Sequence, residues 1–70
     1  MNGELLRRVR KQRGLTIAEA AESVGISRQS LSNYERGVRE PSLKILITLS
    51  NLYQVSLDEL VGKKEFRFGK

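Results

Sequence analysis

The sequence predicts an all-α domain, a compact bundle of five short helices, from three observations. Apolar residues recur every three or four positions in successive stretches of the chain, which is the spacing of one helix face. Residues 16–19 and 56–59 both have the Thr/Ser-x-x-Glu pattern of a capping box, which marks the start of a helix. Glycine or proline interrupts the chain between these stretches, and 70 residues suffice for one small domain.

The first helix is expected to run from Glu4 to Gln12. Its apolar face would consist of Leu5, Leu6 and Val9, and Gly14 would end it. Most of the other positions in this segment are cationic, so we expect one face to pack on the core and the other to face solvent.

The capping box at Thr16 predicts a second helix, which Gly25 would end. The apolar positions at helical spacing in this segment are Ile17, Ala20, Ala21 and Val24. Only Gly25, Ile26 and Ser27 separate this helix from the next one. A turn of this length joins two helices at a steep angle, and the two alanines are small enough to let them cross closely. The sequence therefore predicts a helix-turn-helix.

The third helix is expected to follow Ser27, a preferred N-cap residue, with Ile26 and Leu31 placed for a hydrophobic staple. Leu31 and Tyr34 would share one inward face. Gly37 would end the helix in the left-handed conformation. The polar side chains expected to point outward are Arg28, Gln29, Ser30, Ser32 and Asn33.

Ser42, directly after Pro41, predicts the cap of a fourth helix that extends to about Tyr53. Its core stripe is expected to contain Leu43, Leu46, Ile47, Leu49, Ser50 and Tyr53. Ile45 and Leu52 do not fit this stripe, so they indicate either a second apolar surface or scattered surface residues. The core as a whole is expected to include Leu6, Val9, Ala21, Val24, Leu31, Leu46, Leu49, Val55 and Leu60.

The second capping box, at Ser56, predicts a fifth helix from Leu57 to Val61, ended by Gly62. We therefore expect one domain in residues 1–62 and a basic, aromatic tail in residues 63–70. Charged and aromatic residues alternate from residue 65 to residue 68, which is the period of a strand. Two interpretations stay open: an unstructured end, which we favour, or a ribbon paired with the same segment of a second copy.

Composition restricts the function classes. A net charge of +5 and an isoelectric point near 10.1 favour a polyanionic partner. The chain has no cysteine and no histidine, so disulfides, thiolate metal sites and histidine catalysis are excluded, and Ser30 and Ser32 have no base to activate them. We expect no enzyme activity, no metal and no cofactor. Because no apolar run could span a membrane and residues 1–13 lack the apolar centre of a signal peptide, we expect a cytoplasmic protein.

The segment from Leu5 to Val61, centred on this helix-turn-helix, resembles the lambdoid phage repressor and Cro family of bacterial and phage regulators. The resemblance implies the fold of lambda repressor-like DNA-binding domains, with the helix after Ser27 in the major groove of double-stranded DNA. It also implies a transcriptional regulator, most often a repressor, that acts as a homodimer on a palindromic operator. Nothing in the sequence indicates a small-molecule ligand.

The resemblance assigns base contacts to Arg28, Gln29 and Asn33, whose side chains can fork to guanine or pair with adenine. One residue departs from the family: Ile17 stands where a glutamine often bonds a phosphate, so Thr16 or the helix N-terminal amides would take that role. Phosphate contacts are expected from Thr16, Ser27, Ser30, Ser32, Arg36 and Arg39.

Arg10 and Glu35 match a family ion pair that ties the first helix to the third, although two ordinary exposed charges are the alternative. The candidates for a dimer contact are Ile45, Leu52, Phe66 and Phe68. An alternative function is that of an antitoxin-like module, which neutralises a partner protein through these apolar residues and binds DNA secondarily.

Overall fold

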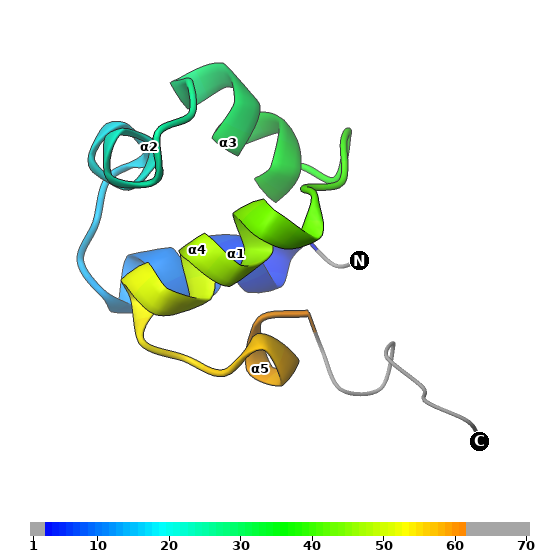
Figure 1. The fold of residues 1–70 in the computed structure, drawn as a ribbon. Coiled ribbons are helices and arrows are strands. Elements are labelled where there is room, and N and C mark those ends of the chain that lie inside the picture. Colours follow the sequence, from blue (N-terminus) through cyan, green and yellow to red (C-terminus); the bar gives the residue numbers. More distant parts are fainter. Residues whose placement is uncertain (1–2, 62–70) are drawn as a thin grey trace.

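The computed structural model describes residues 3–61, and within them the chain forms five α-helices and no strand (Figure 1). The helices are α1 (Gly3–Gln12), α2 (Ile17–Val24), α3 (Arg28–Glu35), α4 (Leu43–Tyr53) and α5 (Leu57–Val61). The prediction of an all-α, five-helix fold is confirmed. Only α1 departs from the expected bounds, since it begins one residue earlier, at Gly3. The stop expected at Gly62 and the tail of residues 63–70 lie outside the described residues.

The helices are arranged so that α3 is supported from inside and open on its outer side. In Figure 1, α2 and α3 lie at one end of the bundle, α5 lies at the other end, and α1 and α4 cross the middle. α3 contacts both α1 and α2, α2 also contacts α4, and α5 contacts α1 and α4. Among the described residues, no helix packs on the outer face of α3.

The helix starts follow from the capping residues that the sequence predicts. Thr16 Oγ1 accepts a hydrogen bond from the Glu19 amide at 3.1 Å, and Glu19 Oε1 accepts one from the Thr16 amide at 2.9 Å. Ser27 Oγ likewise accepts from the Ser30 amide at 3.0 Å. These side chains satisfy amides that have no partner within the first turn of a helix.

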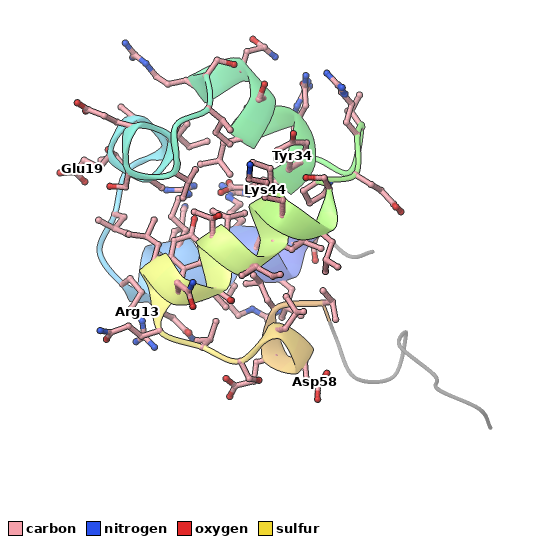
Figure 2. All side chains as sticks on the ribbon, in the orientation of Figure 1. Arg13, Glu19, Tyr34, Lys44 and Asp58 are labelled. Atoms are coloured by element: carbon pink, nitrogen blue, oxygen red, sulfur yellow. The ribbon has the colours of Figure 1, made fainter. Side chains whose placement is uncertain are left out.

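Three further features fix helix ends. Gly25 has φ 77°, and its amide returns to the carbonyl groups of α2, so the chain can turn into α3 after three residues. Gly37, after α3, also has φ 77°, as predicted. At the end of α4, Arg13 Nε donates to the Tyr53 carbonyl at 2.5 Å, a cation at the negative end of the helix dipole (Figure 2).

The core lies between α1, α4 and the inner faces of the other helices. Its buried residues are Leu6, Val9, Ala20, Ala21, Leu31, Leu49, Tyr53 and Leu60. Six of the nine predicted core residues are among them, and the other three, Val24, Leu46 and Val55, are partly buried at its edge.

The predicted inward face of α4 is wrong for four residues. Leu43 and Ile47, which were assigned to the core stripe, are 61% and 44% exposed. Ile45 and Leu52, which were expected outside this stripe as a second apolar surface or as scattered surface residues, are partly buried and pack against the core. The reason is that α4 carries apolar residues around most of its circumference, so periodicity alone does not define which part of it faces inward. The burial of Leu49 and Tyr53 shows which face of α4 is the inward one.

Candidate nucleic-acid interface

α3 presents a row of polar side chains along its outer face. Arg28 and Gln29 are exposed in its first turn, and Asn33 is half-buried one turn later. Leu31, on the opposite side, is completely buried in the core. The three residues expected to contact bases therefore lie on one short helix whose inner face is fixed by packing.

Hydrogen bonds connect this row to the end of the helix. Asn33 Oδ1 accepts one bond from Gln29 Nε2 at 3.1 Å and another from Arg36 Nη2 at 2.8 Å. The residues are four and three positions apart, which are the spacings at which helical side chains meet. The structure thus joins two candidate base contacts to one candidate phosphate contact.

The other residues expected to contact phosphate lie around α3. Thr16 and Ser27 are the N-caps of α2 and α3, and Ser27 Oγ also donates to Ser30 Oγ at 3.0 Å. Ser32 is half-buried on α3, while Arg39 is exposed in the loop that follows it.

A buried ion pair holds α3 against α1. Arg10 Nε donates to Glu35 Oε2 at 2.7 Å and Arg10 Nη2 donates to Oε1 at 3.0 Å, with the two side chains 8% and 4% exposed. Arg10 Nη1 also donates to the Leu15 carbonyl at 2.7 Å, in the turn before α2. The hydrogen bonds to Glu35 raise the pKa of Arg10, although burial acts in the opposite direction. The pair is therefore ionic, and it fixes three segments of the chain relative to one another.

Tyr53 lies completely buried in the core near this pair. Burial raises the pKa of Tyr53 to about 12, and the negative charge of Glu35 acts in the same direction. Its hydroxyl has no hydrogen-bond partner among the described residues. Tyr53 is therefore neutral at ordinary pH and contributes to the domain mainly through its ring.

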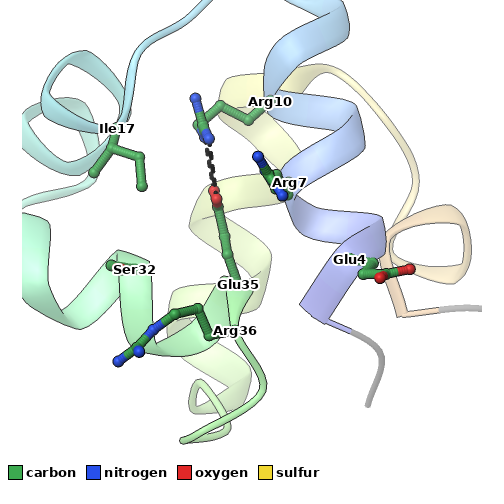
Figure 3. A pocket seen from close by; sticks show the side chains of 7 residues that line it. All are labelled: Glu4, Arg7, Arg10, Ile17, Ser32, Glu35 and Arg36. Atoms are coloured by element: carbon green, nitrogen blue, oxygen red, sulfur yellow. Dashed lines mark hydrogen bonds and ion pairs between the residues drawn. The ribbon is translucent and has the colours of Figure 1, made fainter.

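An open hollow of about 540 Å³ lies beside the ion pair, between α1 and α3 (Figure 3). It is lined by Glu4, Arg7, Arg10, Ile17, Ser32, Glu35 and Arg36. Arg10 and Glu35 neutralise each other there, and the remaining charges of the lining are the guanidinium groups of Arg7 and Arg36 and the carboxylate of Glu4. The two cations outweigh the one carboxylate, so the hollow favours an anion such as a phosphate. Arg7 was not among the phosphate contacts expected from the sequence. The available signal was its spacing, since Arg7 precedes Arg10 by three positions and thus shares its side of α1.

The described part of the chain has neither a metal-binding cluster nor a membrane-spanning helix. Residues 3–61 contain no cluster of carboxylates that could bind a metal ion. None of their helices has the length and apolar character needed to cross a membrane.

Comparison with known proteins finds close relatives of this arrangement. A helix-turn-helix family model matches residues 6–60. The HTH-type transcriptional regulator ImmR of Bacillus subtilis (strain 168) is 49% identical over 63 residues, which cover 90% of this chain and 50% of ImmR. The chain thus spans only about half the length of this curated relative.

Two solved structures are also similar. The P22 c2 repressor in complex with a synthetic operator has a TM-score of 0.78 and 36% identity, and the match covers 83% of this chain and 88% of that chain. A complex of the SinR and SinI proteins has a TM-score of 0.84 and 32% identity, with 91% of this chain and 63% of that chain covered.

Proposed function

The chain belongs to the helix-turn-helix family, and from this membership we propose that it binds double-stranded DNA sequence-specifically as a transcriptional regulator. One observation carries the proposal: α3 exposes a row of guanidinium and amide groups while packing and a buried ion pair hold its inner face. A rigid helix with such side chains fits the major groove of B-DNA, which is wide enough to admit it. Similarity to an operator-bound repressor supports the same mode of binding.

Arg28, Gln29 and Asn33 are the residues that would contact base edges. A guanidinium can fork to guanine O6 and N7, and a side-chain amide can pair with adenine N6 and N7. Each good pair contributes about 1–3 kcal/mol of discrimination between bases.

Phosphate contacts would hold the domain in register without reading sequence. The residues proposed for this role are Thr16, Ser27, Ser30, Ser32, Arg36 and Arg39, and the hollow beside α1 adds Arg7. Each cation that neutralises a phosphate releases counterions, so binding would weaken steeply as salt is added.

A dimer on a palindromic operator is the proposed assembly, because one short helix reads too few base pairs for a useful specificity. The half-sites would lie about 34 Å apart, one turn of DNA. Exposure of Val38, Leu43 and Ile47 supports a contact there rather than at the partly buried Ile45 and Leu52. Bound at a promoter, such a dimer would act as a repressor by occupying the site.

The test begins with selection of bound duplexes from a random DNA pool. We expect a pseudo-palindromic operator. Gln29→Ala should then lose about 1–3 kcal/mol on this operator and little on random DNA. Arg39→Ala, the matched phosphate variant, should lose affinity on both duplexes and lower the salt slope by about one. An equal loss of affinity for both duplexes in Gln29→Ala would contradict base readout by α3.

A second candidate function is binding to a partner protein, in the manner of an antitoxin. It is favoured by the exposed apolar residues Val38, Leu43 and Ile47, and by the similarity to SinR, which was solved in complex with SinI. This function would be favoured over DNA recognition by two results together. The selection would enrich no DNA sequence, and the chain would form a stable complex with a partner protein that Leu43→Gln abolishes.

A further inference from the structure

Arg36, at the C-terminal end of α3, binds Asn33 as well as lying beside the hollow. We propose that Arg36 is a positioning residue, which fixes the pattern of hydrogen-bond donors and acceptors that α3 presents to the major groove. The proposal rests on the proposed function, in which α3 reads bases. It adds to the phosphate role of Arg36 a role in specificity.

The guanidinium of Arg36 determines how both side-chain amides are oriented. It has five N–H donors and no acceptor, so the Asn33 atom 2.8 Å from Arg36 Nη2 must be the amide oxygen. That oxygen can only accept, so the Gln29 atom 3.1 Å from it must be the amide nitrogen. The orientation of both amides is therefore fixed by chemistry, beginning at Arg36.

The two amides are left with different capacities. An amide oxygen has two lone pairs, and both lone pairs of Asn33 Oδ1 are already used by Gln29 and Arg36. Asn33 can then only donate, through Nδ2. Gln29 keeps its oxygen and one N–H, which are the two groups needed to pair with adenine N6 and N7.

This division alters one expectation from the sequence. Asn33 was expected to pair with adenine through both its oxygen and its nitrogen, as Gln29 would. With Oδ1 occupied, Asn33 instead matches a base edge that only accepts: guanine O6 and N7, or thymine O4. Without Arg36, the Asn33 amide could turn over and present its oxygen, so the preference for an acceptor edge would be lost.

The test compares Arg36→Met with Arg39→Met, each of which removes one cation that follows Asn33 in the sequence. The base pair read by Asn33 is first identified as the one at which Asn33→Ala loses discrimination. Affinities are then measured for the selected operator and for duplexes with each other base pair at that position. The parent should discriminate by about tenfold.

Arg39→Met should weaken all of these duplexes by the same factor and keep their ranking. Arg36→Met should weaken them and also reduce the discrimination at the Asn33 base pair to less than about threefold, because the amide is no longer oriented. A uniform loss with the parental ranking would overturn the proposal and leave Arg36 as a phosphate contact only. The proposal would also be overturned if the selection placed an adenine at the Asn33 base pair and removal of its 6-amino group weakened binding. If α3 does not read bases at all, Gln29→Ala would instead lose affinity equally for the operator and for random DNA.

Discussion

At the scale of single residues, the Arg10–Glu35 pair has the largest structural consequence, because both charges are almost fully buried. Removing one partner leaves the other charge unpaired in the core, which costs about 3–5 kcal/mol. A domain of this size is stable by only about 5 kcal/mol or a little more. The same pair holds α3 in place, so its loss should also weaken the proposed binding to DNA.

We predict that Glu35→Leu lowers the free energy of unfolding by about 3–5 kcal/mol, measured by urea denaturation. The double variant Arg10→Met/Glu35→Leu should be more stable than Glu35→Leu alone, because no buried charge remains. A Glu35→Leu protein as stable as the parent would show that the pair is not needed for folding.

Tyr53 provides a second prediction at this scale, because its pKa is about 12 in the folded chain and ordinarily 10.0. Between these values the unfolded chain binds fewer protons than the folded one. The free energy of unfolding should therefore fall as pH rises above 10, by up to about 1.4 kcal/mol per pH unit from this group. Below pH 10 this titration contributes no pH dependence.

Tyr53→Phe removes the titrating hydroxyl and should remove this part of the alkaline loss. At pH 7 the variant should be at least as stable as the parent, because the hydroxyl has no partner to lose among the described residues. Urea denaturation of both proteins from pH 8 to pH 12 makes the comparison, and the remaining tyrosine and the lysines cancel in it. Parallel stability curves for the two proteins would contradict the assignment.

At the scale of elements, local signals predicted where the helices begin and end. Thr16, Ser27 and Ser42 cap helices through hydrogen bonds that span only three residues, so the sequence contains the whole motif. Which face of a helix is buried depends instead on its neighbours. This is why α4 was assigned the wrong edge, although its bounds were right.

The same distinction applies to the candidate site. Capping and spacing predicted that the polar side chains of α3 lie on one short helix, and the family resemblance then implied which of them contact bases or phosphates. The two hydrogen bonds that Asn33 Oδ1 accepts could not be predicted from the sequence, since they depend on which rotamers three neighbouring side chains adopt. The close approach of Gly3 to α3 was also missed: a Cβ there would collide with the carbonyl oxygen of Tyr34.

Two leucines of α4 test the corrected face. Leu49 is completely buried and Leu43 is 61% exposed, so the same substitution should have unequal effects. Leu49→Ala should cost about 2–5 kcal/mol through lost burial and a cavity, whereas Leu43→Ala should change stability by less than about 0.5 kcal/mol. Thermal denaturation of the two variants is the measurement. Similar melting temperatures would restore the original assignment.

At the scale of the whole molecule, a net charge of +5 opposes self-association in solution, whereas the proposed dimer requires two copies to come together on a palindromic operator. The exposed apolar residues Val38, Leu43 and Ile47 cover far less than the roughly 800 Å² per partner of a stable interface. We therefore expect a dimer that forms on DNA, where the duplex neutralises the charge and sets the spacing of the two copies.

The double variant Leu43→Gln/Ile47→Gln tests this contact without changing the charge of the domain. Affinity for a duplex with one half-site should stay at the parental value, because neither residue lies on the outer face of α3. Cooperativity on the full operator, measured by titrating duplexes with one and two half-sites, should fall toward independent binding. Leu43 and Ile47 are both exposed, so the double variant should still fold, and a thermal melt checks this. Unchanged cooperativity would move the contact elsewhere, and Phe66 and Phe68, outside the described residues, would then be the next positions to substitute.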